Sequence, residues 1–494
     1  MGTPLYLIDD LRAIERAAQA QLAPGTLMAR AGRAAADWIA ACHAGTPATF
    51  CIVCGAGNNG GDGFVIAAEL RASGHDVLCV LPGSSPPTAE DARAAFGRWT
   101  AAGGRIHHEI PTDSGFGAVV DALFGIGLAR PLSGPYLDAV AWMNQQQAVY
   151  AIDVPSGLNA DTGAWVDDVP GVRATATITF IGDKPGLHTA SGIDAAGIVT
   201  VDPIGTVAGS SDGMLSTAAD LHAVLTPRRH DSHKGTYGNV AVVGGGRGMA
   251  GAVLLAGRAA LRLGAGRVYV DAIGAPDLRV DPMQPELMFR SMRELTELQA
   301  LVVGCGLGTG SEARSALASS LECDAAVVLD ADALNLVAAD KDLKERVRQR
   351  SAATILTPHP LEAARLLACG ASDVQHDRIA AARRLSREFD VITILKGAGS
   401  VIAGTDGRYA VNSTGSPALA TAGTGDVLAG MLGALLAQGV APWDAAVAAV
   451  WLHGRAADGA GDVGLVASDV AARAAEVLSQ MRASPAAPLR SPAD

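Results

Sequence analysis

The chain has 494 residues, which is too long for one compact core and fits two domains. Hydrophobic residues make up 49% of it, enough for an extensive core and incompatible with global disorder. Only 4% is aromatic and the formal net charge is −12, which excludes the base-stacking and basic surfaces of nucleic-acid-binding proteins. These values predict a soluble, acidic protein that acts on small molecules.

The first 210 residues alternate between helix-like and strand-like runs. Residues 7–42 predict helices, and the N-terminus contains no apolar signal core. Strands are predicted at 49–54, 76–81, 118–123 and 148–152, and helices at 64–72, 89–101 and 137–145. Such alternation indicates βαβ units and a parallel sheet.

Polar turns follow three strands of this predicted sheet. The Gly-rich segment 54–63 opens the first long helix, as a phosphate-binding turn does, although a plain strand–turn–helix connection is the alternative. Asp121 and Asp153 end two other strands, where carboxylates are normally solvated caps. Together with Asn59 and Ser156 they can instead form an oxygen-lined site for a hard cation, whose identity the residue types leave open.

A polar, Gly- and Ser-rich stretch at 205–213 predicts the linker between two domains. We therefore expect a first domain at 1–210, a second domain at 211–484 and a disordered tail at 485–494. The second domain repeats the alternation of the first, with strands predicted at 238–243, 267–272, 300–303, 325–329, 353–356 and 391–395. This pattern indicates a second parallel α/β sheet.

The segment 412–430 is Gly-rich and nearly uncharged until Asp426 appears where an apolar helix begins. Gly423 and Gly425 let the backbone turn sharply, and the unpaired N–H groups of the helix start favour an anion. An aspartate there would repel a bound phosphate, so a structural role suits it poorly. It is well placed to take a proton from a hydroxyl while a phosphoryl group is transferred. The alternative is that Asp426 only caps the helix.

Three more Gly- or Pro-containing turns lie at the ends of predicted strands of the second domain, at 302–308, 357–362 and 396–400. Ligands of open parallel sheets bind at the carboxyl ends of the strands, where all these turns lie. Their convergence with the Asp426 segment indicates a ribokinase-like, nucleotide-dependent enzyme.

The seven cysteines show no metal-ligand spacing, and we expect reduced thiols in a cytoplasmic protein. Cys51 and Cys54 have the spacing of a redox pair, but in an extended run residues three apart face opposite sides. No apolar run reaches membrane-spanning length, because Gln438, Pro442 and Asp444 interrupt the longest one. A membrane protein is therefore not expected.

Both halves together resemble the bifunctional NAD(P)H-hydrate repair enzymes, from about Leu7 to about Ala483. In this family an NAD(P)H-hydrate epimerase is fused to an ADP-dependent NAD(P)H-hydrate dehydratase. In the first domain the resemblance rests on 58–63, 121–127, 153–157 and 184–187. In the second it rests on 235–238, 244–246, 249–252, 304–308, 330–334, 357–360, 396–398 and the Asp426 segment.

The resemblance implies an α/β fold of two three-layer α/β/α domains, the first with a Rossmann-like sheet and the second with a ribokinase-like sheet. The first domain would interconvert the R and S epimers of the NADH and NADPH hydrates (NADHX and NADPHX). The second would dehydrate the S epimer to NAD(P)H, converting ADP to AMP and phosphate, with Mg²⁺ on the nucleotide. K⁺ would bind in the first domain, and we expect a homo-oligomer.

The resemblance also assigns roles to residues. The substrate of the first domain would be held by Asn58, Asn59, Gly60, Gly61, Asp62, Gly125, Ile126, Gly127, Leu128, Ala129, Arg130, Pro131, Tyr136 and Asp153. K⁺ would be bound by Asn59, Asp121 and Ser156, and Asp153 would be the catalytic acid and base. In the second domain the hydrate would be held by Ala252, Gly308, His359 and Asp426, and the nucleotide by Lys396, Gly397, Ala398, Gly399, Ser400 and Gly425. Asp426 would activate the hydroxyl, whereas for His359, flanked by two prolines, a packed loop histidine is the alternative.

Two positions depart from the family pattern. Cys305 stands where relatives usually have proline, and Arg247 lies in a turn that is more often small and neutral. We expect neither residue to touch a residue with an assigned role. The alternative function is a small-molecule kinase of the same superfamily, whose product keeps its phosphate, fused to a Rossmann-like binding domain.

Overall fold

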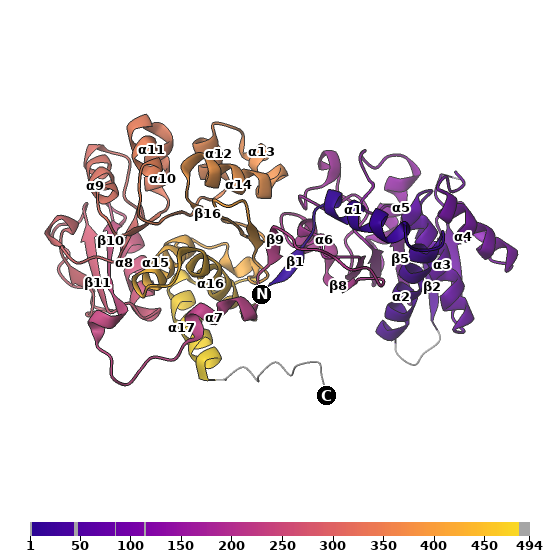
Figure 1. Ribbon diagram of the computed structural model, residues 1–494, viewed down its shortest axis with the longest axis horizontal. Coiled ribbons are helices and arrows are strands. Elements are labelled where there is room, and N and C mark those ends of the chain that lie inside the picture. The colour runs from indigo at the N-terminus through magenta and orange to yellow at the C-terminus, as the bar shows by residue number, and fades with distance from the viewer. Residues whose placement is uncertain (1, 44–47, 84, 113–114, 484–494) are drawn as a thin grey trace. The chain divides into compact units, whose positions relative to one another are not determined.

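The computed structural model describes residues 2–43, 48–83, 85–112 and 115–483. The predicted disordered tail at 485–494 lies outside these residues. By its internal contacts the chain divides into two units, Pro4–Gly213 and Met214–Asp494 together with Met1–Thr3. The division falls at the end of the predicted linker, where residues 203–212 form neither helix nor strand (Figure 1).

The first unit contains a seven-stranded sheet in the order β4-β3-β2-β5-β6-β7-β8, and every neighbouring pair is parallel. Its strands are β2 (Thr49–Cys54), β3 (Asp76–Val80), β4 (Ile106–His107), β5 (Ala118–Ala122), β6 (Val149–Ile152), β7 (Ala176–Phe180) and β8 (Ile198–Asp202). The chain leaves β2 toward β3 and β4 and returns to β5, so the strand order reverses beside β2. Such a switch point opens a crevice for a ligand at the carboxyl ends of the strands.

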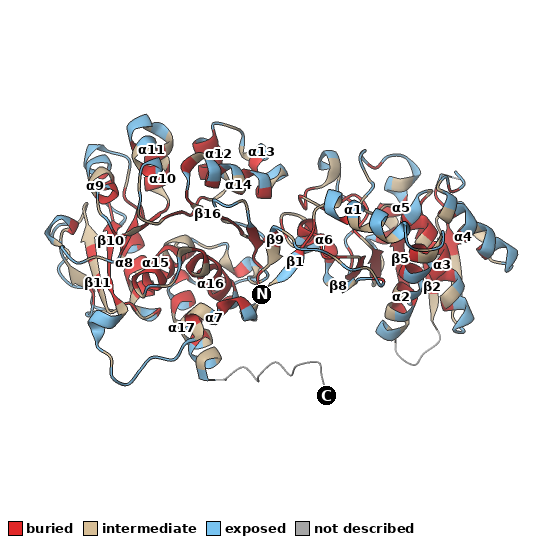
Figure 2. Ribbon diagram, viewed as in Figure 1, coloured by how far each residue is buried: buried red, intermediate tan, exposed pale blue. Residues whose placement is uncertain are grey.

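Helices cover both faces of this sheet. They are α1 (Ile8–Gln19), α2 (Thr26–Cys42), α3 (Asn58–Ala72), α4 (Glu90–Ala101), α5 (Pro135–Met143) and α6 (Gly192–Ala196). Phe50 and Ile52 of β2 pack in one apolar cluster with α2, α3 and α4, whereas Cys51 and Val53 pack in another with α5. The sheet is therefore the buried middle layer of three (Figure 2). The prediction that Cys51 and Cys54 face opposite sides is confirmed, since they belong to different clusters.

The second sheet, whose strands β10 to β18 all belong to the second unit, has eleven strands in the order β1-β9-β18-β17-β16-β15-β14-β13-β10-β11-β12. From β16 to β12 all neighbours are parallel, whereas β16, β17 and β18 pair antiparallel. The strands are β1 (Thr3–Leu5), β9 (Gly213–Leu215), β10 (Asn239–Gly244), β11 (Arg267–Ala272), β12 (Met288–Phe289), β13 (Ala300–Val303), β14 (Ala326–Leu329), β15 (Thr354–Leu356), β16 (Ile392–Leu395), β17 (Val401–Ala403) and β18 (Tyr409–Val411). The carboxyl ends of β10 and of β13 to β16 therefore lie along one edge of the sheet.

The helices of the second unit form two layers, with α8 and α15 to α17 on one side of the strands and α9 to α14 on the other (Figure 1). They are α7 (His222–Leu225), α8 (Ala250–Arg262), α9 (Ser311–Leu321), α10 (Asp332–Ala339), α11 (Lys341–Arg348), α12 (Pro360–Leu367), α13 (Ala371–His376), α14 (Arg378–Phe389), α15 (Thr424–Ala437), α16 (Pro442–Arg455) and α17 (Ala467–Ala483). Short 3-10 helices lie at Val166–Asp168, Pro185–Leu187, Ala218–Leu221, Lys234–Tyr237, Met292–Glu294 and Pro417–Leu419.

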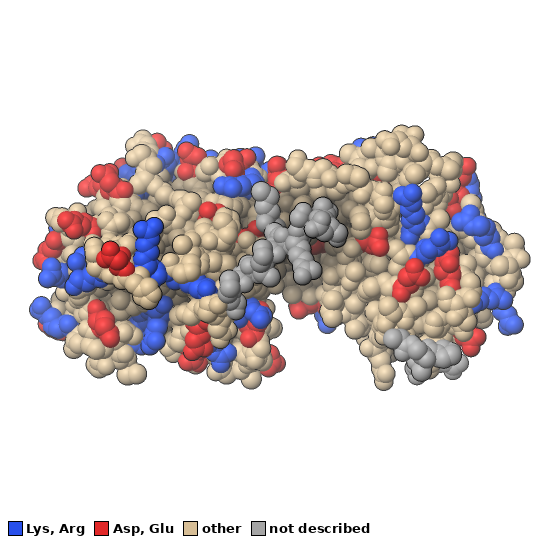
Figure 3. All heavy atoms as spheres, turned by 60° about the horizontal axis from the view of Figure 1, so that its bottom comes forward, with Lys and Arg blue, Asp and Glu red and all other residues tan. Residues whose placement is uncertain are grey.

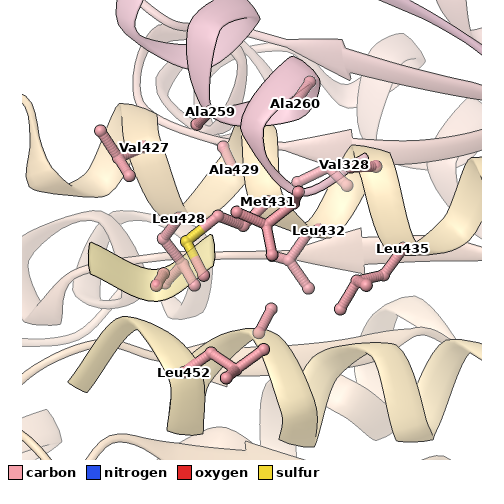
Figure 4. Packing of buried hydrophobic residues seen from close by; sticks show 14 of the residues in the cluster. Ala259, Ala260, Val328, Val427, Leu428, Ala429, Met431, Leu432, Leu435 and Leu452 are labelled. Atoms are coloured by element: carbon pink, nitrogen blue, oxygen red, sulfur yellow. The ribbon is translucent and has the colours of Figure 1, made fainter. Parts of the chain in front are cut away.

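Helix α15 lies at the centre of the core of the second unit. Figure 4 shows its apolar side chains between Ala259 and Ala260 of α8 and Leu452 of α16. Gly430 permits the close approach of α8, because a Cβ there would lie 2.0 Å from the carbonyl oxygen of Ala256. The first turn of α15, which carries Asp426, is thus held by tight packing of the whole helix.

The predicted fold class is confirmed by these two α/β/α units. Every predicted strand agrees with the structure within one residue at each end. The predicted helix at 64–72 is wrong at its start, because α3 begins at Asn58. Strands β1, β4, β7, β8, β9, β12, β17 and β18 were not predicted.

Two further observations concern the helices and the surface charge of the described residues. No helix among them is long and apolar enough to cross a membrane. On the face seen in Figure 3, basic and acidic side chains are interspersed, and no broad surface is basic alone. The seven cysteines are all free thiols, as predicted.

Candidate active sites

A hollow of about 460 Å³ opens at the switch point of the first unit. Its walls come from α1, from the start of α3 and from the residues that follow β5, β6 and β7. Of the predicted substrate residues, those that line it are Asn58, Asn59, Asp62, Gly125, Ile126, Gly127, Leu128 and Asp153. The others, which are not among the described residues that line it, are Gly60, Gly61, Ala129, Arg130, Pro131 and Tyr136.

The glycines at the start of α3 bring this helix against the end of β2. A Cβ at Gly60 would lie 1.8 Å from the carbonyl oxygen of Gly55, and one at Gly63 would lie 2.8 Å from the sulfur of Cys54. Only glycine fits such contacts. The helix start, with Asn58 as its first residue, therefore faces the hollow with its positive end.

Asp153 lies directly after β6 in a left-handed backbone conformation, with φ of 69°. Such a conformation is costly for a residue with a side chain and persists where its surroundings hold it. Its Oδ1 lies 2.9 Å from the ammonium of Lys184, whose side chain is 1% exposed, and the N–H of Ile126 donates to Oδ2 over 3.4 Å. Lys184 also donates to the Thr179 hydroxyl at 2.5 Å and to the Phe180 carbonyl at 3.1 Å. These contacts fix the carboxylate of Asp153 at the wall of the hollow.

Three further carboxyl groups line the same hollow: Glu15 of α1, Asp62 of α3 and Asp91 just inside α4. Burial, together with the carboxylates of Asp153, Glu15 and Asp91, raises the pKa of Asp62 well above its usual range. The pKa of Glu15 is raised by burial and by Asp153. Crowded carboxylates oppose one another's ionisation, so these groups hold a proton more strongly than isolated carboxyl groups do.

Two of the predicted K⁺ ligands, Asp121 and Ser156, are in direct contact. Asp121 is fully buried, and Ser156 donates to it through its N–H at 2.8 Å and through its hydroxyl at 2.7 Å. Burial raises the pKa of Asp121 to about 6, although these hydrogen bonds lower it. Asn59 lies beside Gly125, where an added Cβ would be 3.4 Å from its amide oxygen and 2.8 Å from the carboxylate of Asp153.

In the second unit Asp426 lies in the first turn of α15. The helix begins at Thr424, and the preceding Gly423 has φ of 91°, a conformation that favours glycine. The first N–H groups of a helix have no partner within it, and its positive end lies there. The predicted Gly-rich turn at the positive end of a buried helix is therefore found.

Lys396, which follows β16, reaches the start of α15, because a Cβ at Gly425 would lie 3.3 Å from its ammonium. It forms an ion pair with Asp330 after β14, a carboxylate that is 2% exposed and accepts the Thr357 hydroxyl at 2.8 Å. Burial lowers the pKa of Lys396, but the carboxylates of Asp330 and Glu362 outweigh it and raise the pKa overall. A charged ammonium therefore stands at the helix start, where an anionic ligand would bind.

The expectation that Cys305 touches no residue with an assigned role is wrong. Its thiol is fully buried, and its sulfur and one carboxylate oxygen each of Asp330 and Asp426 lie within 4.8 Å of one another. Burial raises the pKa of Asp426 to about 6, with Asp330 adding to this effect and the thiol opposing it. Gly304 and Gly306 have φ of 123° and 59°, so the chain turns sharply on both sides of Cys305 and brings its side chain to the helix start.

His359 is the N-cap residue of α12. Its Nδ1 accepts the N–H groups of Leu361 at 3.1 Å and Glu362 at 3.3 Å, so the ring proton resides on Nε2, 3.2 Å from the Glu362 carboxylate. The structure thus gives His359 a capping role, while 45% of its side chain stays exposed to a ligand.

The other predicted hydrate-binding residues meet at the turn after β13. A Cβ at Gly306 would lie 3.1 Å from the Cβ of Ala252. The N–H of Gly308 donates at 2.8 Å to Asp332, one of the carboxylates that raise the pKa of Asp426. Ala252 and Gly308 therefore lie on the same side of the sheet edge as Asp426.

The predicted nucleotide loop, 396–400, is closed by Ser400, whose hydroxyl accepts the N–H of Gly397 at 3.2 Å. Arg378 contacts the strand end directly before this loop. Its side chain is 1% exposed and donates to the carbonyl of Leu395 at 3.2 Å. Burial lowers the pKa of Arg378 to about 10. The guanidinium therefore remains charged and fixes the end of β16 from which the loop begins.

Two family profiles match this chain. Residues 24–186 match the profile described as the N-terminus of YjeF-related proteins, and residues 240–479 match that of NAD(P)H-hydrate dehydratase. The bifunctional NAD(P)H-hydrate repair enzyme of Escherichia coli (strain K12) is 36% identical over 470 residues, which cover 92% of this chain and 89% of the relative. The chain belongs to the bifunctional NAD(P)H-hydrate repair enzymes.

The chain is also similar to other proteins. The bifunctional NAD(P)H-hydrate repair enzyme of Coxiella burnetii is 38% identical and covers 95% of this chain and 98% of its own. The ADP-dependent (S)-NAD(P)H-hydrate dehydratase of Neisseria meningitidis serogroup B is 45% identical over 50% of this chain and 84% of its own. The crystal structure of an ADP/ATP-dependent NAD(P)H-hydrate dehydratase from Bacillus subtilis with ATP and Mg²⁺ covers 54% of this chain and 99% of its own, with 30% identity and a TM-score of 0.48.

Sequence reasoning missed three residues that build the two sites of this bifunctional enzyme. Lys184 and Asp330 lie in segments that carried the resemblance, yet no role was assigned to either. The signal for Lys184 was a charged residue directly before Pro-Gly, and the signal for Asp330 was a carboxylate at the end of an apolar strand. Arg378 gave no such signal, because it begins an ordinary amphipathic helix.

Proposed function

We propose that the first unit interconverts the R and S epimers of the NADH and NADPH hydrates, and that the second dehydrates the S epimer with ADP as phosphoryl donor. The observation that carries this proposal is the cluster of Asp426, Lys396 and Asp330 at the start of α15. It combines a proton acceptor, a cation and a helix N-terminus, which phosphoryl transfer to a hydroxyl requires. The names of the relatives support the substrate and the nucleotide.

The proposed dehydration replaces a poor leaving group with a good one. The hydrate carries a hydroxyl on a saturated ring carbon, and Asp426 takes its proton while the oxygen attacks the terminal phosphoryl group of ADP, releasing AMP. The ester then loses phosphate together with a proton of the neighbouring ring carbon, which restores the double bond of NAD(P)H. With a pKa of about 6, Asp426 is ionised at neutral pH and still accepts a proton readily.

The nucleotide would lie between Lys396 and the start of α15. The ammonium and the free N–H groups of the helix stabilise charge on the transferred phosphoryl group. ADP would enter as its Mg²⁺ complex, in which the ion neutralises phosphate charge. Arg378 supports this role because it holds the strand end from which the nucleotide loop begins.

In the first unit Asp153 would remove and return the proton of the hydroxyl during epimer exchange. Lys184 supports this role, since its ammonium pairs with the carboxylate and fixes its orientation. The second requirement is a carboxylic acid, and Asp62 and Glu15 fit it because burial and neighbouring carboxylates raise the pKa of both side chains.

K⁺ would bind against Asp121, Ser156 and Asn59. The described contacts of Asp121 are neutral N–H and O–H groups, so this fully buried carboxylate lacks a cationic partner among them. The side-chain nitrogen of Asn59 is buried without a hydrogen-bond partner among the described residues. Because amide oxygen and nitrogen are assigned from their surroundings, a rotated amide would present its oxygen to an ion. Such hard oxygen donors fit K⁺, which would supply the missing positive charge.

The test is recovery of the NADH absorbance band from a mixed-epimer hydrate with ADP, with ATP or with neither, alongside release of inorganic phosphate. We expect full recovery with ADP and one phosphate for each NADH. A phosphorylated product that accumulates without NADH would favour the small-molecule kinase instead. The cytoplasmic location and the homo-oligomer remain predictions.

A further inference from the structure

The proposed reaction leaves one partner of Asp426 without a role: the thiol of Cys305. The sulfur of Cys305 and one carboxylate oxygen each of Asp330 and Asp426 all lie within 4.8 Å of one another, and the thiol is fully buried. The thiol comes from the turn after β13, whereas Asp426 belongs to α15. The contact therefore ties the proposed base to the edge of the sheet.

The backbone of Cys305 is fixed on its other side. Its carbonyl accepts the N–H of Gly245 at 3.0 Å, and the carbonyl of Gly306 accepts that of Gly246 at 2.6 Å. A Cβ at Gly244 would lie 2.2 Å from the carbonyl oxygen of Cys305, so the end of β10 packs directly against this turn. The sheet therefore sets the position of the thiol.

The proton of this contact resides on the sulfur. Burial and the carboxylates of Asp426 and Asp330 raise the pKa of the Cys305 thiol well above its usual range, so the thiol donates and Asp426 accepts. The other charged groups that act on Asp426 are Asp330, Asp332 and Lys396, and the ammonium of Lys396 is bound to Asp330. The neutral thiol is therefore the group of this cluster that can donate a hydrogen bond to Asp426.

We propose that Cys305 is a positioning residue of the second site: its thiol donates a hydrogen bond to Asp426 and holds that carboxylate in the orientation that accepts the proton of the hydrate. This inference rests on the proposed dehydration. The thiol occupies one carboxylate oxygen and leaves the other for the substrate hydroxyl. It also stabilises the ionised carboxylate against repulsion by Asp330, which keeps the base unprotonated at lower pH.

The test is the pH dependence of kcat/KM for the hydrate at saturating ADP. In the wild type, activity should rise with pH as Asp426 loses its proton, with a midpoint of about 6. In Cys305→Ala the lost hydrogen bond should move the midpoint upward by about half a unit to one unit, which lowers activity below the midpoint about 3- to 10-fold. Cys305→Ser keeps a donor and should restore the wild-type midpoint.

Cys369→Ala is the control, because this thiol lies between α12 and α13 and does not contact the cluster in any described interaction. Cys305→Val replaces the alanine variant if the latter does not unfold cooperatively or does not bind ADP in calorimetry. An unchanged midpoint in a folded alanine or valine variant overturns the positioning role, and so does an equal loss of activity at every pH. If the wild type gives no ADP-dependent recovery at any pH, the proposed function has failed and the inference falls with it.

Discussion

Each of the two sites contains an ion pair between a lysine and an aspartate at the strand ends. The aspartate of the pair is the proposed acid and base in the first site but not in the second. In the first unit Lys184 holds Asp153, the proposed acid and base itself. In the second unit Lys396 forms an ion pair with Asp330, and the proposed base Asp426 lies beside the thiol of Cys305 instead. The lysine of the first site is therefore used to orient a catalytic side chain. The lysine of the second site is left facing the helix start, where the nucleotide would bind.

This difference matches the two proposed reactions. Epimer exchange needs a carboxylate that gives and takes one proton repeatedly, and a fixed ion pair keeps it in place. Phosphoryl transfer needs positive charge on the ligand and a base that accepts a proton, and a carboxylate beside another carboxylate is the stronger base. The predictions below separate the two arrangements.

The largest expected effect comes from Asp426→Ala. Loss of the proposed base should lower ADP-dependent NADH recovery by roughly 10²–10⁴, while epimer exchange continues at the wild-type rate. Asp469→Ala is the matched control, because Asp469 also lies in the first turn of a helix but is exposed. Both rates are measured by chromatography that separates the epimers. Near-normal recovery in the Asp426 variant would remove this residue from the mechanism.

Lys184→Met should stop epimer exchange and also destabilise the first unit. It leaves a carboxylate facing an apolar wall, and breaking a buried ion pair in this way costs about 3 kcal/mol. The double variant Lys184→Met/Asp153→Asn removes both charges and should recover part of the stability without recovering exchange. Thermal unfolding and epimer exchange are measured on both variants. A single variant as stable as the wild type would show that the pair contributes little.

Potassium should stabilise the first unit through Asp121. At about 50 times its Kd the ion should raise the free energy of unfolding by about 2 kcal/mol, and Asp121→Ala should abolish the gain. Melting curves with K⁺ and with choline at equal ionic strength measure it. The site assignment fails if wild type and variant respond to K⁺ identically.

The smallest expected effect concerns His359. Loss of its cap in His359→Ala should lower the free energy of unfolding by about 1 kcal/mol, whereas His359→Asn keeps a capping group and the stability. Both variants should raise the KM for the hydrate, because each removes the exposed imidazole. A wild-type KM in His359→Asn would leave the histidine with its capping role alone.

Strands such as β2 and β13 were predictable because they are short, buried apolar runs that glycine follows directly. The missed β7 carries Thr177 and Thr179 in its centre, and Thr177 is buried only because its hydroxyl donates to the carbonyl of Ala196. The early start of α3 was missed because glycine disfavours helix in isolation. Packing against Gly55 overrides that preference, and it is invisible in the local sequence.

The candidate sites were predictable where a motif sits at a strand end, as at Asp153 and Asp426. Contacts between such motifs were not predictable from the sequence, because they depend on the order of the strands in the sheet. Cys305 and Asp426 are far apart in the sequence. They lie close together because the turn after β13 is next to the start of α15. For the same reason the ion pair of Lys396 with Asp330 follows from the order of β14, β15 and β16.

The central claim is that one chain carries two separate sites linked only by a diffusing epimer. Asp426→Ala and Asp153→Ala are purified and mixed in equal amounts, and both epimers are followed by chromatography with ADP present. Alone, the first variant should exchange epimers without dehydrating them, and the second should consume the S epimer and leave the R epimer. The mixture should convert both epimers to NADH. A mixture that still leaves the R epimer, or an Asp426 variant that no longer exchanges epimers, would contradict the account.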